Sequence, residues 1–290
     1  MPRVISGRTR LCGVLGYPLE HTLSPPMHNA AFAALGLDWV YLPWPVVPER
    51  LGEALRGLRA LANFAGANVT VPHKEAVIPH LDELTEEARA VGAVNTIVCA
   101  GDRLTGHTTD GAGLLAALAE AADFRPGGAS VVIVGAGGAG RSAAFALAVA
   151  GARQVTILNR SEARARALAA DVARAAHGGK VLAYQLLITP STAQILGGAD
   201  LVVNATSVGM RPGDPSPVDL ALCRPAAVAY DMVYNPPETP FLRQARSRGL
   251  RAANGLGMLL YQGAAAFALW TGRAAPVGAM RGALAAGETA

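Results

Sequence analysis

The chain has 290 residues, of which 51% are hydrophobic and 16% are charged. This length and composition exclude a disordered protein and favour a well-buried α/β protein of two domains. The net charge of +4 and the pI of about 9.2 do not indicate a nucleic-acid partner, because the basic residues are scattered and no aromatic residues are interleaved with them.

The three cysteines, Cys12, Cys99 and Cys223, lie far apart and are odd in number. They form neither a metal-ligand spacing nor a disulfide framework, so we expect a reducing compartment and no metal site. Residues 1–16 contain no apolar segment of the signal-peptide type, and no apolar stretch is long enough to cross a bilayer. We therefore expect a cytoplasmic protein without a membrane partner.

The first predicted elements are a buried strand at Arg10–Gly16 and a helix at Met27–Leu35, separated by a polar loop. In that loop Ser24 precedes Pro25, a combination typical of a helix start with serine as the N-cap. Two interpretations of the loop are open. Either Ser24 is only this cap, or Thr22 and Ser24, two residues apart on an extended segment, direct both hydroxyls into one cleft.

The segment Asn68–Lys74 contains the most informative cluster of polar residues in the chain. A β-type run ends at Pro72, which cannot donate a hydrogen bond to a sheet and has a fixed φ angle. This strand end brings an amide, the Thr70 hydroxyl and the Lys74 amine together within one short segment, which suits a polar small molecule. We interpret Lys74 as the proton donor and acceptor of a hydride-transfer enzyme.

Strands alternate with helices in this half of the chain, with a strand at Asp38–Trp44 and helices at Pro48–Leu61 and Thr85–Val91. The alternation indicates parallel βαβ units, whose strand ends meet at one edge, where ligands bind. Asn95 stands at the start of a further strand and requires hydrogen-bond partners if it is buried. Asp110 precedes an alanine-rich helix, and it is either a first-turn carboxylate favoured by the helix dipole or a functional acid.

A second set of elements begins with a buried strand at Ala129–Val134. Directly after it the sequence Gly135-Ala136-Gly137-Gly138-Ala139-Gly140 opens a helix that continues to Ala150. Glycines in this pattern permit a tight turn and let the backbone approach a pyrophosphate, whose charge meets the N-terminus of the helix. The motif in this context predicts a dinucleotide-binding domain.

The next strand, Gln154–Leu158, ends in Asn159-Arg160-Ser161. NAD-binding folds usually carry an acidic residue here, which accepts from the ribose 2′-hydroxyl, whereas an arginine suits a 2′-phosphate. No acidic residue stands at this strand end, but Arg160 and Arg164 do, and arginine makes forked contacts with phosphate. The pattern favours NADP over NAD, with a solvated helix start bearing scattered arginines as the alternative.

Two polar residues of the last third of the chain have more than one interpretation. Tyr234 follows a strand and is either presented at the sheet edge or half-buried as a packing residue. Gln262 lies in the second turn of a long helix that begins near Gly255, where it either bonds within the core or reaches a ligand. Further elements are predicted as strands at Val181–Leu186, Asp200–Asn204 and Ala227–Met232, and as helices at Thr189–Leu196, Pro240–Arg248 and Val277–Ala285.

Several motifs in one order extend from Gly13 to about Trp270. They are Asn68 to Lys74, Gly92 to Thr96, Thr109-Asp110-Gly111, Gly135 to Gly140, Asn159-Arg160-Ser161 with Arg164, Asn204 to Ser207, Tyr230-Asp231-Met232 with Tyr234, and Gly255 to Met258 with Gln262. In this order they resemble the shikimate dehydrogenase family over nearly the whole chain.

The resemblance implies a mostly parallel α/β substrate-binding catalytic domain of residues 1–110 plus 255–290 and a Rossmann-type NADP-binding domain of residues 111–254, with a C-terminal helix returning to the first domain. It implies the NADPH-dependent, reversible reduction of 3-dehydroshikimate to shikimate in the biosynthesis of chorismate and the aromatic amino acids. Lys74 and Asp110 match the catalytic pair of the family. Substrate-binding positions match Thr22, Ser24, Thr70, Asn95, Tyr234 and Gln262. Nucleotide-binding positions match Gly135, Ala136, Gly137, Gly138, Ala139, Gly140, Asn159, Arg160, Arg164, Met232 and Gly255.

Two residues depart from the pattern of the family. Thr22 stands where a serine is usual, and His107 stands where an asparagine is usual. Both departures leave the choice among shikimate, quinate and aminoshikimate open. The alternatives are therefore a quinate/shikimate dehydrogenase that uses NAD or NADP, a two-domain dehydrogenase acting on a folate, and a non-catalytic nucleotide-binding redox sensor. Monomer and homodimer both stay open.

Overall fold

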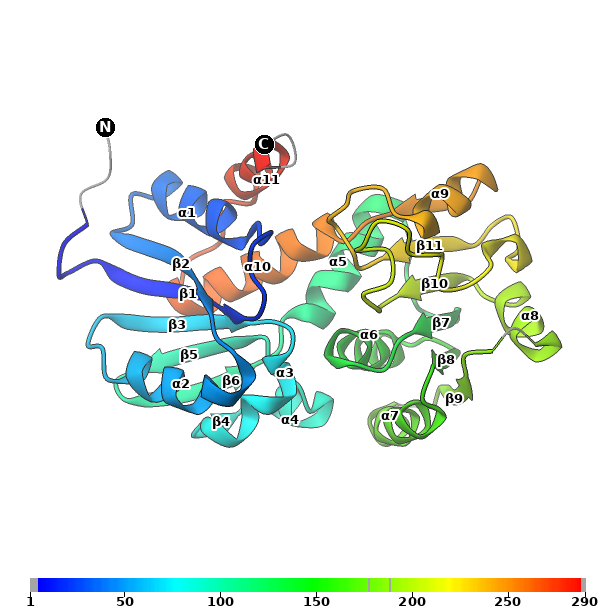
Figure 1. The fold of residues 1–290 in the computed structure, drawn as a ribbon, viewed down its shortest axis with the longest axis horizontal. Helices are drawn as coiled ribbons and strands as arrows, with labels where there is room; N and C mark the ends of the chain where they lie inside the picture. Colours follow the sequence, from blue (N-terminus) through cyan, green and yellow to red (C-terminus); the bar gives the residue numbers. More distant parts are fainter. Residues whose placement is uncertain (1–4, 177, 188, 288–290) are drawn as a thin grey trace. The chain divides into compact units, whose positions relative to one another are not determined.

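The computed structural model describes residues 5–176, 178–187 and 189–287, which form two compact units (Figure 1). Unit 1 comprises Met1–Thr109 and Leu260–Ala290, and unit 2 comprises Asp110–Leu259. Unit 2 is therefore inserted into the sequence of unit 1. Within the described ranges, no helix combines the length and the apolar character needed to cross a membrane.

Unit 1 is built on a six-stranded sheet in the order β2-β1-β3-β5-β6-β4. Its strands are β1 (Arg10–Gly16), β2 (Trp39–Pro45), β3 (Phe64–Val69), β4 (Glu83–Leu84), β5 (Thr96–Ala100) and β6 (Arg103–His107). β5 pairs antiparallel with both of its neighbours, and the other pairings are parallel. The sheet is thus mostly parallel, as predicted, with β5 as the reversed strand.

Helices cover both faces of this sheet, so that β3 is buried along its whole length. Leu51 and Leu55 of α2 pack in one core with Leu15 and Ile97. On the other side, Phe32 of α1 contacts Phe267 of α10 at a ring-centroid distance of 5.4 Å. The helical segments with residues in unit 1 are α1 (Ser24–Ala34), η1 (Pro48–Arg50), α2 (Leu51–Arg59), α3 (His73–Ala76), η2 (Ile78–His80), α4 (Glu86–Val91), α10 (Leu256–Thr271) and α11 (Val277–Gly287).

Unit 2 contains a six-stranded sheet in the order β12-β11-β10-β7-β8-β9, with every pairing parallel. Its strands are β7 (Ser130–Val134), β8 (Gln154–Asn159), β9 (Lys180–Gln185), β10 (Leu201–Asn204), β11 (Val228–Asp231) and β12 (Arg251–Ala253). Counted in chain order the arrangement is 3-2-1-4-5-6, the order of a Rossmann fold. The direction of winding reverses between β7 and β10, which is the point where such folds bind nucleotides.

The helical segments of unit 2 flank this sheet. They are α5 (Asp110–Ala122), α6 (Gly138–Val149), α7 (Glu162–Ala175), α8 (Pro190–Gly197), η3 (Leu220–Leu222) and α9 (Pro240–Ser247). β7 is buried at all of its positions. Its continuous apolar character in the sequence therefore reflects a central strand covered on both faces.

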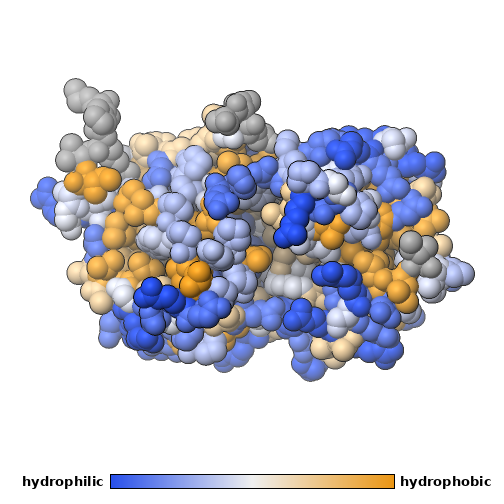
Figure 2. Space-filling view, viewed as in Figure 1, coloured by the Kyte–Doolittle hydropathy of each residue, from blue (hydrophilic) through white to orange (hydrophobic). Residues whose placement is uncertain are grey.

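The surface in view mixes hydrophilic and hydrophobic residues (Figure 2). Exposed large apolar side chains include Leu42, Val71, Val149 and Met210, which lie far apart in the sequence. Single exposed apolar residues of this kind are normal for folded proteins and do not by themselves mark an interface.

Candidate active site

In unit 1, polar residues from distant segments meet at one edge of the sheet. β3 ends at Val69, so Thr70 and Lys74 follow at its carboxyl end. Because β5 runs antiparallel to β3, the start of β5 lies beside the end of β3. The Val69 amide accordingly donates to the Asn95 carbonyl oxygen at 2.8 Å. The topology therefore places Asn95, Thr70 and Lys74 at the same edge.

Asn95 lies at the centre of a buried hydrogen-bond cluster. Its Nδ2 donates to Thr109 Oγ1 at 2.9 Å and to Gln262 Oε1 at 3.2 Å. Its Oδ1 accepts from the Thr109 amide at 2.7 Å and from Thr96 Oγ1 at 3.2 Å. Thr109 Oγ1 also donates to the Gln262 carbonyl oxygen at 3.1 Å. The requirement that a buried Asn95 find partners is met, and one cluster holds the start of β5, the end of the segment after β6, and α10 together.

Backbone contacts fix the segment that carries Lys74. The Lys74 carbonyl oxygen accepts from the Val94 amide at 2.8 Å, and the Thr70 carbonyl oxygen accepts from the His73 amide at 2.8 Å. The His73 side chain is buried and lies 2.7 Å from the Val46 carbonyl oxygen, so Nε2 carries a proton and donates. The half-buried Lys74 side chain therefore starts from a fixed backbone at the edge that also holds Asn95.

The prediction that Ser24 is an N-cap is wrong. Ser24 is the first residue of α1, the N-cap position is Leu23, and no side chain caps this helix. An N-cap serine accepts from the second or third amide of its helix, but Pro26 has no amide proton, and the Met27 amide donates to the Leu23 carbonyl oxygen. Instead, Thr22 Oγ1 accepts from the Ser24 amide at 3.4 Å. The Ser24 hydroxyl is buried and does not cap α1.

Two of the residues predicted for catalysis or substrate binding, Asp110 and Tyr234, belong to unit 2. Asp110 is the first residue of α5 and is 3% exposed, and Tyr234 is half-buried after β11. Lys74 belongs to unit 1, so the pairing of Lys74 with Asp110 stays a prediction. Asp110 directly follows Thr109, the residue held by Asn95.

The three glycines of the Gly-x-Gly-x-x-Gly turn have three different surroundings. Gly135 has a φ of +112°, which favours glycine. A Cβ on Gly140 would lie 2.3 Å from the Gly135 carbonyl oxygen, so the first turn of α6 packs directly on the turn after β7. A Cβ on Gly137 would meet no atom within 4 Å. The open side of Gly137, at the N-terminus of α6, thus fits the close approach of a pyrophosphate.

Arg160 and Arg164 lie exposed at the end of β8 and in the first turn of α7. Ser161 caps α7 by accepting from the Arg164 amide at 3.4 Å, and Asn159 Nδ2 donates to the Ser161 carbonyl oxygen at 3.0 Å. Arg166 pairs with Glu162 at 2.6 Å, whereas no ion pair of the described residues involves Arg160 or Arg164. Both guanidinium groups therefore fit a phosphate at this strand end.

A buried polar network supports the neighbouring strand ends of unit 2. Asn204 Nδ2 donates to Asp231 Oδ1 at 2.9 Å, and Thr239 Oγ1 donates to Asp231 Oδ2 at 2.5 Å. Burial raises the pKa of Asp231 to about 6, against these hydrogen bonds, which lower it. After β11, a Cβ on Gly255 would lie 2.2 Å from the Met232 carbonyl oxygen, so the predicted cofactor positions Met232 and Gly255 are in direct contact.

Comparison with known proteins identifies the family. Residues 14–97 match the model of the shikimate dehydrogenase substrate binding domain, residues 118–209 that of shikimate / quinate 5-dehydrogenase, and residues 255–285 that of the shikimate 5′-dehydrogenase C-terminal domain. The shikimate dehydrogenase (NADP(+)) of Citrifermentans bemidjiense is 50% identical over 282 residues, which are 97% of each chain. The chain belongs to the shikimate dehydrogenase family.

Solved structures of this family have the same fold. Shikimate 5-dehydrogenase from Listeria monocytogenes, in complex with shikimate and NAD, superposes with a TM-score of 0.88 at 37% identity, covering 98% of this chain and 99% of that one. The Thermus thermophilus enzyme, in complex with NADP(H) and shikimate, gives a TM-score of 0.84 at 39% identity, covering 96% and 99%. The predicted α/β fold with a Rossmann-type part is thereby confirmed.

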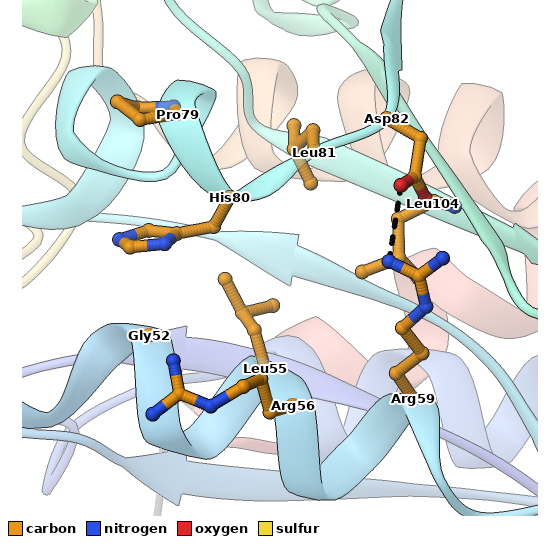
Figure 3. Close-up of a pocket in the computed structure, with 9 residues that line it drawn as sticks. All are labelled: Gly52, Leu55, Arg56, Arg59, Pro79, His80, Leu81, Asp82 and Leu104. Atoms are coloured by element: carbon orange, nitrogen blue, oxygen red, sulfur yellow. Dashed lines mark hydrogen bonds and ion pairs between the residues drawn. The ribbon is translucent and has the colours of Figure 1, made fainter.

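A pocket of about 280 Å³ in unit 1 is lined by none of the predicted site residues (Figure 3). Figure 3 shows Arg56 and His80 at one end of it and the Arg59–Asp82 ion pair, at 3.0 Å, at the other. Arg59 ends α2 just before β3 begins, so this pocket lies toward the sheet edge opposite Lys74. Its polar side chains are partly or fully exposed, and we do not assign the substrate of the shikimate dehydrogenase family to it.

Tyr41 and Thr239 belong to the buried polar clusters but were not predicted, and Thr109 and Asp231 were named only within motifs, without a role of their own. Tyr41 donates to Asn68 Oδ1 at 2.7 Å, and Thr109 bonds Asn95. A signal was present in Asn68, an amide within a buried strand, because such a side chain needs a donor and an acceptor nearby. The sequence did not show which residues bond the Asn68 side chain, since Tyr41 lies on another strand, β2.

Proposed function

We propose that this protein catalyses the reversible, NADPH-dependent reduction of 3-dehydroshikimate to shikimate, in the pathway to chorismate and the aromatic amino acids. The observation that carries the proposal is the 50% identity, along 97% of the chain, to a relative named shikimate dehydrogenase (NADP(+)). The polar cluster around Asn95 in unit 1 and the open glycine turn of unit 2 support it.

Lys74 is assigned the acid–base role. Bound NADPH supplies a hydride to the carbonyl carbon of the substrate, so negative charge develops on the carbonyl oxygen. A protonated Lys74 stabilises this charge and donates its Nζ proton to the oxygen; in the reverse direction it accepts the proton. We assign Asp110 as the second residue of the catalytic pair.

The substrate's hydroxyl and carboxylate groups are assigned to six residues. The assigned residues are Thr22, Ser24, Thr70, Asn95, Tyr234 and Gln262. Asn95 already directs two Nδ2 contacts to Thr109 and Gln262, and the Gln262 contact is the longer, at 3.2 Å. A substrate hydroxyl that bonds Asn95 therefore replaces Gln262 Oε1, which then becomes an acceptor for a substrate hydroxyl. Binding exchanges hydrogen bonds in a preformed cluster, and few side chains need to be ordered.

NADP is assigned to unit 2. The turn Gly135-Ala136-Gly137-Gly138-Ala139-Gly140 holds the pyrophosphate at the N-terminus of α6, and Asn159, Arg160 and Arg164 bind the 2′-phosphate. Met232 and Gly255 are assigned to the same nucleotide. In this assignment residues 1–110 with 255–290 form the catalytic domain and residues 111–254 the NADP domain.

We also propose a cytoplasmic location. The three cysteines are free and buried, which fits a reducing compartment. Shikimate and NADP are proposed as the small-molecule partners, with no nucleic-acid and no membrane partner. The two proposed assembly states are a monomer and a homodimer, and light scattering distinguishes them.

The test is the initial rate of NADP⁺ reduction with shikimate, run beside quinate and beside NAD⁺. Turnover with shikimate and NADP⁺ well above the other pairs supports the reaction and the cofactor together. A preference for quinate or NAD⁺ keeps the chemistry but overturns the specificity, and directs attention to Thr22, His107 or Arg160. The absence of turnover with every pair overturns the proposed function in favour of a nucleotide-binding sensor.

A further inference from the structure

Tyr41, on β2, is a buried polar residue that the assigned chemistry does not use. It is 1% exposed, and its hydroxyl donates to Asn68 Oδ1 at 2.7 Å. Asn68, at 6% exposure on β3, donates in turn through Nδ2 to the Asn95 carbonyl oxygen and to Thr96 Oγ1, both at 3.1 Å. A continuous buried path of hydrogen bonds therefore leads from Tyr41 to Asn95.

The Tyr41 residue is itself fixed on several sides. Asn29 of α1 bonds its main chain twice, since the Tyr41 amide donates to Asn29 Oδ1 at 2.9 Å and the Tyr41 carbonyl oxygen accepts from Asn29 Nδ2 at 2.9 Å. The ring stacks on the buried His28 ring at a centroid distance of 4.4 Å and an interplanar angle of 10°. The hydroxyl is thus held in one place by groups that lie outside the substrate cluster.

The hydroxyl of Tyr41 decides how the Asn68 amide is satisfied. With this donor present, Asn68 Oδ1 faces Tyr41 and Nδ2 faces Asn95. Without it, Oδ1 becomes a buried acceptor that has lost its donor, which is costly, and the amide has to turn to find another. Turning removes the Nδ2 contact from the Asn95 carbonyl oxygen. Asn95, which also bonds Thr109 and Gln262, then loses one of the contacts that hold it in place.

We propose that Tyr41 is a positioning residue for substrate binding: through Asn68 it fixes Asn95, and with Asn95 the amide of Gln262. The proposal rests on the function assigned above, because it takes Asn95 and Gln262 as substrate-binding residues. Tyr41 acts at a distance of two side chains and does not touch the reacting atoms. Its effect therefore falls on the binding of shikimate and leaves the binding of the nucleotide unchanged.

The experiment compares Tyr41→Phe with the unmodified enzyme, using initial rates with shikimate and NADP⁺ each varied in turn. Phenylalanine keeps the ring that stacks on His28 and removes the hydroxyl alone. We expect the KM for shikimate to rise about 10-fold, because small misplacements of positioning groups cost up to about 100-fold in rate, while the KM for NADP⁺ stays within about twofold of its original value. Tyr261→Phe is the matched control: it removes a phenolic hydroxyl of unit 1 that lies 3.3 Å from Arg281, and both constants should stay unchanged.

A second variant tests the path through Asn68. In an Asn68→Ala background, adding Tyr41→Phe should not change the KM for shikimate further, since the connecting amide is already gone. If the KM increases of the two single substitutions multiply in the double variant, Tyr41 acts by another route and the proposal is overturned. An unchanged KM for shikimate in Tyr41→Phe, or an equal rise in both KM values, would overturn it too. A wild-type chain that oxidises no shikimate would instead overturn the proposed function before any variant is compared.

Discussion

Gly137 and Gly140 lie three residues apart in one turn, and the structure predicts opposite consequences for the same substitution. In Gly140→Ala the new Cβ would lie 2.3 Å from the Gly135 carbonyl oxygen and 2.9 Å from its carbon, which are backbone atoms of the turn after β7. Overpacking of this kind costs about 1–3 kcal/mol. Since 1 kcal/mol corresponds to about 2–4 °C for a domain of this size, the Tm should fall by roughly 2–12 °C.

Gly137→Ala introduces no such clash. Gly137 has φ −90° and ψ −173°, an extended conformation that any residue adopts, and no atom lies within 4 Å of the added Cβ. The Tm should therefore stay unchanged. The methyl group would occupy the side from which the pyrophosphate approaches, and losing a charged hydrogen bond there costs about 1.5–3 kcal/mol. The dissociation constant for NADPH should rise about 10- to 150-fold.

Both quantities are measured on purified protein, the Tm by calorimetry and NADPH binding by fluorescence titration. Gly127→Ala is the control, because Gly127 is exposed and its added Cβ also meets no atom within 4 Å. An equal loss of Tm in Gly137→Ala and Gly140→Ala would refute the distinction drawn from their surroundings. An unchanged NADPH affinity in Gly137→Ala would refute the placement of the pyrophosphate.

Three further predictions concern single side chains. Lys74→Ala should lower kcat by about 10²–10⁴ through loss of an acid–base group, with shikimate still bound; a raised KM with kcat intact would make Lys74 a binding residue. Arg160→Ala should raise the KM for NADP⁺ far more than that for NAD⁺, and equal rises would contradict a 2′-phosphate contact. Neither ring nitrogen of the buried His28 has a hydrogen-bond partner among the described residues, and burial lowers its pKa from 6.5 to about 3. The unfolded chain therefore takes up a proton that the folded state excludes, so stability is complete above pH 6.5 and falls by about 1.4 kcal/mol per pH unit as the pH drops toward 3. In His28→Phe this part of the acid sensitivity should disappear from urea titrations, and parallel pH profiles for both proteins would contradict the assignment.

The order of strands and helices was largely predictable because burial and periodicity determine it. β1 and the strand–glycine–helix unit of unit 2 were predicted in place, since continuous apolar runs bounded by glycine have few alternative structures. α7 and β12 were not predicted. α7 buries two alanines beside Leu168 and Val172 and is rich in arginine, which weakens its apolar pattern, and β12 is an edge strand of three residues. The start of α1 was misplaced because Pro26 has no amide proton that an N-cap serine at position 24 could bind.

The residue types of the candidate site were predictable from motifs, but their partners were not. Asn95 and Gln262 are 167 residues apart in the chain and 3.2 Å apart in their side-chain contact. No local pattern encodes this pairing, because it depends on how α10 packs against the sheet of unit 1. The same reason hides Tyr41, whose contribution comes from the strand order β2-β1-β3. Sequence reasoning therefore finds the groups that carry chemistry more readily than the groups that hold them.

The interrupted course of unit 1 along the chain has a consequence for synthesis on the ribosome. All six strands of its sheet are translated before residue 110, yet Gln262 and Trp270, which bond Asn95 and the Ile97 carbonyl oxygen, emerge only after the 150 residues of Asp110–Leu259. At about 5–20 residues per second, this delay is roughly 8–30 s. During that interval the nascent sheet lacks α10, while unit 2 is continuous and can fold as soon as it is released. We therefore expect the nucleotide-binding unit to mature first and shikimate binding to appear only at the end of translation.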